Sequence, residues 1–255
     1  NIRKTETANT YELKLAFTEV QNEYVSHLKS VYNLIAKVDK EKVIFYRYLN
    51  YATQNWKKQN VEDITYIISP QHTFSKKQAE DQLSFTKILQ DFFELDPMEI
   101  TYYSCKNPIE IYQIKGFDYY YPMYLSSTGG LAEFNNIIFS GNDKDIYSHE
   151  ITHLYAIRSS GDYINTLLNE GIATYLAGSS EIPYKTHRQN LMNYIKTHPD
   201  FKFSEHLNPY EDFYINEDTS VPYTIGALIC EMVLTNKNKR TLLKMLEIPE
   251  NEKAF

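Results

Sequence analysis

The chain has 255 residues, of which 42% are hydrophobic and 23% charged, the proportions of a globular protein with a substantial core. A formal net charge of −7, without a clustered Lys/Arg patch, argues against a nucleic-acid-binding protein. No run of about eighteen apolar residues occurs, so we expect no membrane span. The sequence begins at Asn1 rather than Met, which favours an exported protein (periplasmic, cell-surface or secreted) that has lost an N-terminal segment.

The first sixty residues show a helical spacing of apolar side chains. The stripe runs through Val20, Tyr24, Leu28, Val31, Tyr32 and Ile35. A Tyr-rich stretch over residues 42–58 is also predicted to be helical. Together they predict an N-terminal helical extension over residues 1–60, and whether this region regulates the rest is left open.

The next part of the chain predicts a small mixed sheet over residues 61–145. Residues 64–68 and 100–105 are rich in β-branched and aromatic residues, which favours strands, and residues 110–114 are predicted as a third. Between them, residues 75–94 have the amphipathic spacing of a helix that Ser75 caps. The consecutive Tyr119, Tyr120 and Tyr121 are interpreted as half-buried strand residues, with a substrate groove as the alternative.

His149-Glu150-Ile151-Thr152-His153 has the pattern H-E-x-x-H. Residues i and i+4 share one face of a helix, so both imidazoles can reach one metal ion. Glu150 lies where its carboxylate can touch a metal-bound water without binding the metal. The simpler interpretation is a surface helix with scattered His and Glu.

A second acidic motif follows at residues 168–175, L-N-E-G-I-A-T-Y. Its apolar residues have helical spacing, so a second helix packed on the first could present Glu170 to the metal. Two His and one Glu form one of the known ligand sets of catalytic zinc, which keeps a fourth position open. Gly161, in the loop between the motifs, is expected to stop the first helix.

The paired motifs H-E-I-T-H and L-N-E-G-I-A-T-Y resemble those of the gluzincin metallopeptidases, which are peptidase MA-like, and are most similar to the aminopeptidase N family. The resemblance covers residues 146–177, with a shorter gap between the motifs than in that family. By position it implies His149, His153 and Glu170 as zinc ligands, one Zn²⁺ per chain, and Glu150 as general base.

The same resemblance directs attention to residues 129–139. In gluzincins the strand before the H-E-x-x-H helix is an edge strand to which a substrate backbone can add. Aminopeptidase N relatives carry G-x-M-E-N there, with a Glu that binds the substrate amine. This chain has Gly130 and Glu133 but not that motif in register, so these two remain candidate substrate-binding residues. Residues from Phe134 are predicted as the strand.

After Glu170 the chain is predicted to be helical over residues 184–197, 221–234 and 240–246. Pro222 suits the first turn of the middle helix. Tyr223 matches the Tyr that stabilises the oxyanion in the aminopeptidase N branch, and the alternative is a core tyrosine at a helix start. Tyr210 and Tyr214, in the preceding loop, are rival candidates.

The remaining cysteines and histidines carry no metal-type spacing. Cys105 and Cys230 are expected to be buried thiols, although a disulfide between them is left open. The other histidines are expected to lie on the surface or in loop contacts: His27, His72, His187, His198 and His206.

These observations predict an α+β, zincin-like fold, with a catalytic domain over residues 61–255. A sheet subdomain (61–145) is expected over a helical subdomain (146–255), with zinc in the cleft. The expected function is a zinc metallopeptidase that hydrolyses peptide bonds by a zinc-activated water, acting on a peptide or protein substrate. The alternatives are a non-catalytic, zincin-like surface or binding protein with a structural zinc, and a hydrolase of a non-peptide amide. The oligomeric state and the choice between endo- and exopeptidase stay open.

Overall fold

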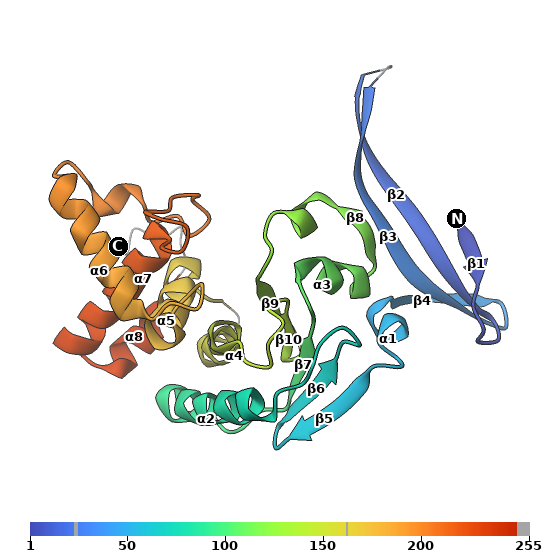
Figure 1. Ribbon diagram of the computed structural model, residues 1–255, viewed down its shortest axis with the longest axis horizontal. Coiled ribbons are helices and arrows are strands. Elements are labelled where there is room, and N and C mark those ends of the chain that lie inside the picture. The colour runs from blue at the N-terminus through green and yellow to red at the C-terminus, as the bar shows by residue number, and fades with distance from the viewer. Residues whose placement is uncertain (23–24, 162, 249–255) are drawn as a thin grey trace. The chain divides into compact units, whose positions relative to one another are not determined.

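The computed structural model describes residues 1–22, 25–161 and 163–248 (Figure 1). The chain divides into two compact units, each built from two segments. The first contains Asn1–Glu80 and Glu99–Ile146, and the second contains Asp81–Met98 and Tyr147–Phe255.

The first unit begins with an antiparallel sheet. It consists of β1 (Ile2–Lys4), β2 (Thr10–Asn22), β3 (Val25–Asp39), β4 (Lys42–Arg47) and β8 (Phe117–Tyr120). The strand order is β1-β2-β3-β4, and β8 also pairs with β3. The four-residue helix α1 (Leu49–Ala52) follows β4. Tyr119 and Tyr120 are half-buried on β8, as the strand interpretation expected, whereas Tyr121 is exposed in the 3-10 helix η1 (Tyr121–Tyr124).

The predicted N-terminal helices are wrong, because the described residues of both stretches form mainly strands. Tyr24 lies outside the described residues. The helical spacing was misleading because both faces of β3 carry apolar residues. Neighbours such as Val31 and Tyr32 point to opposite faces of the strand, but in the sequence they resemble adjacent residues of an apolar helix stripe. The Val, Ile, Tyr and Phe residues of these stretches favour extended backbone. Some of their partners on neighbouring strands lie far along the chain, as in the pair Val31 and Tyr119.

The first unit also contains a second, mixed sheet, as predicted. Its order is β5 (Lys57–Val61), β6 (Ile64–Ile68), β7 (Ile100–Ser104), β10 (Ile137–Ser140) and β9 (Gly130–Glu133). The central pairs β6·β7 and β7·β10 are parallel, whereas β5 and β9 are antiparallel edge strands. The predicted strands at residues 64–68 and 100–105 are therefore confirmed.

Two details of this region differ from the prediction. Residues 110–114 are not a strand but part of helix α3 (Pro108–Ile114), because Asn107 accepts a capping hydrogen bond from the Glu110 N–H and Pro108 suits the first turn. The strand expected from Phe134 begins at Ile137 instead. Asn135 and Asn136 adopt positive φ (65° and 56°) and make the turn that joins β9 to β10.

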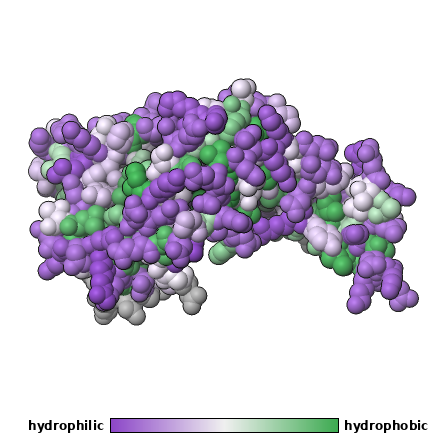
Figure 2. All heavy atoms as spheres, turned by 90° about the horizontal axis from the view of Figure 1, so that it is seen from below, coloured by the Kyte–Doolittle hydropathy of each residue, from purple (hydrophilic) through white to green (hydrophobic). Residues whose placement is uncertain are grey.

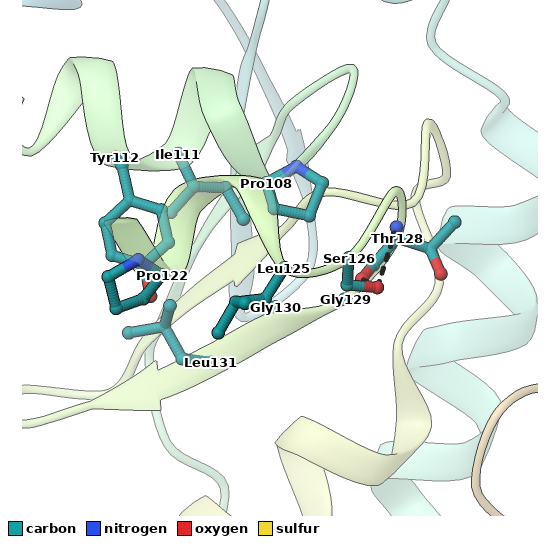
Figure 3. A pocket seen from close by; sticks show the side chains of 10 residues that line it. All are labelled: Pro108, Ile111, Tyr112, Pro122, Leu125, Ser126, Thr128, Gly129, Gly130 and Leu131. Carbon is teal, nitrogen blue, oxygen red and sulfur yellow. Dashed lines mark hydrogen bonds between the residues drawn. The ribbon is translucent and has the colours of Figure 1, made fainter. Parts of the chain in front are cut away.

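A small pocket lies between α3, η1 and β9 (Figure 3). Its volume is about 160 Å³. Its walls are mostly apolar and include Pro108, Tyr112, Pro122 and Leu131. No charged side chain lines it, so its chemistry differs from that of a metal or catalytic site.

A histidine whose side chain is only 3% exposed holds the segment that follows β10 in place. The His72 ring has its Nδ1 2.8 Å from Asp143 Oδ1 and its Nε2 3.0 Å from Asp145 Oδ2. Asp145 is fully buried and also accepts hydrogen bonds from the Ser75 N–H and the Ser104 hydroxyl, both at 2.6 Å. Burial alone would lower the pKa of His72, but the hydrogen bonds to Asp145 and Asp143 outweigh it and raise that pKa.

Stability should therefore depend on pH through His72. The raised folded-state pKa means that the stabilisation is complete below the unfolded value of about 6.5 and is lost as the pH rises through the folded value. Replacing His72 by Gln should lower the free energy of unfolding by on the order of 2 kcal/mol at pH 5, with a shrinking difference above neutral pH. Urea titrations across pH would measure this, with the exposed His27→Gln as control. A difference that does not vary with pH would contradict the assignment.

The second unit is helical (Figure 1). It contains most of α2 (Lys76–Phe93), and α4 (Ser148–Ser160), α5 (Thr166–Ala177), α6 (Tyr184–Thr197), η2 (Phe203–Glu205), α7 (Val221–Asn236) and α8 (Lys239–Leu246). The predicted helices are confirmed, with Ser75 Oγ accepting from the Gln78 N–H at the start of α2 and Gly161 ending α4 with φ 75°. Leu191, Val221 and Ile225 form a buried cluster between α6 and α7.

Two glycines allow α5 and α7 to pack closely. A Cβ atom added at Gly171 would lie 2.4 Å from the backbone carbon of Gly226, so neither helix tolerates a side chain at this crossing. The contact fixes the two helices against each other over the turns that carry Glu170 and Tyr223.

The described residues thus form a mixed α and β protein with two small sheets and eight α-helices, consistent with the predicted α+β class. Cys105 and Cys230 are both buried and free, so the disulfide alternative does not hold. Within the described part of the chain, no helix is long and apolar enough to cross a membrane. The face drawn in Figure 2 is largely hydrophilic, with separate apolar patches.

Candidate metal centre

Helix α4 presents both histidines of the H-E-x-x-H motif from one side. Its first residues follow Tyr147, whose backbone N–H donates to Gln82 Oε1 of α2 at 2.7 Å. Ile151 and Tyr155 are fully buried and anchor the helix in the unit. His149 and His153 lie one turn apart and are only 9% and 7% exposed, which is unusual for polar rings that lack a function or a partner.

Helix α5 supplies the third candidate ligand. It begins at Thr166 after Asn165, whose side chain accepts from the Leu168 N–H at 3.0 Å. Leu168 and Ile172 are fully buried, and Glu170, two residues from each, lies on the side of the helix that meets His149 and His153 of α4. Both helices belong to the same unit.

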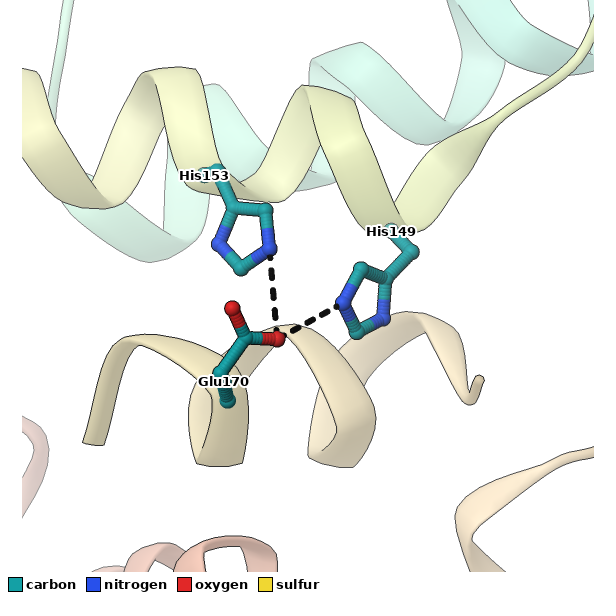
Figure 4. A group of neighbouring side chains, drawn as sticks. All are labelled: His149, His153 and Glu170. Carbon is teal, nitrogen blue, oxygen red and sulfur yellow. Dashed lines mark hydrogen bonds and ion pairs between the residues drawn. The ribbon is translucent and has the colours of Figure 1, made fainter. Parts of the chain in front are cut away.

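The structure brings His149, His153 and Glu170 together (Figure 4). Glu170 Oε2 lies 3.2 Å from His149 Nε2 and 3.5 Å from His153 Nε2. One ligand atom from each residue lies within 4.8 Å of the others. Among the described residues, these three side chains form the group of His, Cys, Asp or Glu whose ligand atoms lie close enough together to hold one metal ion.

The far nitrogen of each ring is also engaged. His149 Nδ1 donates to the Gly178 carbonyl at 2.7 Å, and His153 Nδ1 donates to Asn169 Oδ1 at 3.0 Å. These contacts fix both rings with Nε2 pointing toward Glu170 (Figure 4). Such outer contacts orient metal-binding histidines and set which nitrogen is free to bind.

The charges in the site favour a cation. Burial alone would raise the pKa of Glu170, but hydrogen bonds and the charges of His149 and His153 hold it well below its usual range. Burial alone would lower the pKa of His153, but Glu170 and the Glu150 charge raise it to about 9. The Glu170 carboxylate therefore stays ionised, and its negative charge favours a positively charged group beside it.

This donor set fits zinc. Two imidazole nitrogens and one carboxylate oxygen form a three-ligand set of the kind found in catalytic zinc sites. The preset ring orientations and the ionised carboxylate suit this role, and His153, whose pKa is raised to about 9, would release its Nε2 proton when a metal binds.

Glu150 lies on α4 next to His149 and is half-buried. It is not part of the ligand group. Its charge contributes to the raised pKa of His153 and of Tyr223. A carboxylate that neighbours a candidate ligand without joining the ligand group is a candidate general base.

Tyr223 also belongs to the site. It lies in the first turn of α7, where Ser220 caps the helix. Its ring lies nearly parallel to that of His149, with centroids 6.1 Å apart and an interplanar angle of 11°. Burial, and then the charge of Glu170 and a hydrogen bond to it, raise the pKa of Tyr223, so the phenol stays protonated and can donate.

The rival tyrosines are placed differently. Tyr210 is 80% exposed, and its backbone N–H bonds Asn208 Oδ1. Tyr214 is 50% exposed, and Glu170 influences its pKa only after burial and Asp212. Tyr223 is therefore the better candidate of the three.

Gly130 and Glu133 lie on the edge strand β9 of the first unit. The Glu133 carboxylate forms ion pairs with Lys115 and with Arg47, the latter at 3.6 Å. Lys115 and Arg47 already neutralise the negative charge with which Glu133 would bind the amine of a substrate. The substrate-binding role of both residues stays a prediction.

Three residues around the site were not predicted from the sequence. Asn169 directly precedes Glu170 in the motif, and Gly178 follows α5 as a helix-ending glycine, so a local signal existed for both. His187 was expected at the surface or in a loop contact but is fully buried on α6. Its place three residues after Tyr184 and four before the buried Leu191 was a local signal, because this spacing puts it on the buried face of α6.

No known protein family matches this chain, and no curated protein sequence matches it.

Proposed function

We propose that this chain is a zinc metallopeptidase of the gluzincin type, with a zincin-like fold and one zinc ion held by His149, His153 and Glu170. The observation that carries the proposal is the convergence of three ligand atoms within 4.8 Å, with both imidazoles oriented through their far nitrogens. A carboxylate and a protonated phenol adjoin the same cluster. Zinc, when bound, would supply a Lewis acid that polarises a scissile carbonyl and lowers the pKa of water.

Glu150 and Tyr223 carry out the remaining steps of the proposed reaction. Glu150 takes a proton from the attacking water and delivers it to the leaving amine nitrogen. Tyr223 donates a hydrogen bond to the oxygen of the tetrahedral intermediate, where negative charge develops. Because that charge is absent from the ground state, this contact lowers the barrier rather than only tightening substrate binding.

Removing the Tyr223 hydroxyl tests this role. Tyr223→Phe should lower kcat about 100-fold with little change in KM or in zinc affinity, since the lost hydrogen bond forms mainly in the transition state. Steady-state kinetics on a cleaved peptide would measure the effect, with the exposed Tyr210→Phe as the matched control. An unchanged kcat in Tyr223→Phe would remove this residue from the catalytic set.

The proposed function itself is tested with a mixture of peptides of varied sequence. The zinc-loaded protein should cleave a subset of them, as mass spectrometry of the products would detect. Activity should disappear with a chelator and return when zinc is added back. A zinc-loaded protein that cleaves none of the peptides would support the alternative, a binding protein with a structural zinc.

A further inference from the structure

His187 is not one of the three candidate ligands, and its described hydrogen bonds go to Ser179 and Thr219 instead. It is on α6, fully buried, and both of its ring nitrogens are bonded. Nε2 lies 3.0 Å from the carbonyl oxygen and 3.1 Å from the hydroxyl of Ser179, and Nδ1 lies 3.2 Å from the Thr219 hydroxyl. A buried ring with two partners on two different loops connects those loops.

The first of these loops orients a candidate metal ligand. Ser179 follows Gly178, whose carbonyl accepts the hydrogen bond from His149. Two histidines from two helices thus bind consecutive carbonyls of one turn, His149 at Gly178 and His187 at Ser179. The position of the Gly178 carbonyl, and hence of the His149 ring, depends on how firmly this turn is held.

The turn has little freedom of its own. Ser179 and Ile182 exchange backbone hydrogen bonds at 3.1 and 2.8 Å. A Cβ atom at Gly178 would lie 2.1 Å from the Ile182 carbonyl oxygen, so the chain passes too close for any other residue. His187 fastens this compact turn to α6.

The second loop carries the start of α7. Thr219 is fully buried and directly precedes Ser220, which caps the helix at the Tyr223 N–H. The Thr219 hydroxyl accepts from Asn190 Nδ2 at 2.9 Å. Its own hydrogen is then free for His187 Nδ1, and His187 Nε2–H donates to Ser179. The hydrogen bonds run in one direction from Asn190 through Thr219 and His187 to the turn.

This chain of hydrogen bonds, from Asn190 through Thr219 and His187 to Ser179, requires a neutral imidazole with one donor and one acceptor nitrogen. Burial is the main cause that lowers the pKa of His187, so the neutral form prevails at neutral pH. In this form both ring nitrogens of His187 and the Thr219 hydroxyl have partners.

We propose that His187 is a positioning residue of the metal site. Through Ser179 and Thr219 it holds the turn that orients His149 and the loop that begins the helix of Tyr223. The inference rests on the proposed zinc site, and it assigns the rigidity of that site to a residue that touches neither metal nor substrate.

The test measures the affinity of the full chain for zinc alone, by competition with a chromogenic chelator. His187→Ala should bind zinc about tenfold more weakly, the loss typical of an outer partner of a ligand. His187→Gln keeps an N–H for the Ser179 carbonyl and should recover affinity to within about threefold of the wild type. His198→Gln, at the exposed end of the same helix, is the matched control and should bind as the wild type does.

Circular dichroism would establish that each variant is folded before its affinity is compared. If His187→Ala does not fold, Thr219→Val replaces it, because this variant keeps the histidine and removes only the hydroxyl at Nδ1. A folded His187→Ala or Thr219→Val that binds zinc as tightly as the wild type would overturn the inference. A wild type that binds no zinc would overturn it together with the proposed function, whereas a wild type that binds zinc without cleaving peptides would overturn only the latter.

Discussion

Replacing Glu150 by Gln should reduce peptide cleavage about 1,000-fold while leaving zinc bound, because general acid–base groups contribute on the order of 10² to 10⁴ in rate. The amide is nearly isosteric with the carboxylate but cannot accept a proton from water. Glu150 lies outside the group of candidate ligands, so its loss removes no donor atom. The expected signature is therefore a fall in kcat with unchanged metal content.

Two measurements on the same preparation would establish this result: kcat for a cleaved peptide and the zinc content per chain. Glu205→Gln is the matched control, since Glu205 is an exposed carboxylate that pairs with Lys202 at 2.8 Å. Its rate should equal that of the wild type. Undiminished hydrolysis by Glu150→Gln would reject the base assignment, and loss of zinc from that variant would show that Glu150 acts on the metal instead.

Glu170→Gln is expected to have the second large effect, a fall in zinc affinity of about 100-fold or more, beyond the range seen for outer partners of ligands. Glu170 is the anionic member of the cluster, and its Oε2 faces both histidine Nε2 atoms. The amide keeps the shape of the side chain but removes the charge that a cation requires. Activity at limiting zinc should fall in parallel.

Chelator competition would measure the affinity of this variant. Glu211→Gln is a close control, because Glu211 also pairs with a histidine of the same unit, at 2.9 Å from His206 Nδ1. That change should leave zinc affinity unaltered. A Glu170→Gln protein with full zinc occupancy under competition would remove Glu170 from the ligand set.

The sequence predicted those parts of the molecule whose signals are local. His149 and His153 share a helix face because of their spacing alone, and α7 begins after Ser220 with Pro in its first turn. Helix α5 could be predicted in the same way from the spacing of its buried residues, which brings Glu170 toward α4. Close packing of α5 on α7 required the pair Gly171 and Gly226, which no local pattern links.

The N-terminal strands could not be predicted because they depend on pairing across long stretches of chain. Strand β3 gains partners from β2, β4 and β8, the last more than eighty residues away, as in the pair Ser30 and Tyr120. Tertiary pairing of this kind overrides an accidental helical spacing. Helix α3 is a different case, since Asn107 and Pro108 did provide a local helix-start signal that the β-rich composition of residues 109–114 obscured.

The contacts that Gly178 and His187 make around the site form only in the tertiary structure. The carbonyl of Gly178 meets His149, twenty-nine positions earlier in the chain, only after α5 has packed against α4. His187 likewise reaches Thr219, thirty-two positions away. Such partners depend on the path of the loops, which motif spacing does not encode.

The metal content of the purified protein, measured in parallel for the wild type and for His149→Ala, decides whether the three residues form a metal site. We expect about one zinc ion per wild-type chain and little or none in His149→Ala, since that variant loses one of the three ligands. A wild-type protein that holds no metal, even after incubation with zinc, would show that they do not.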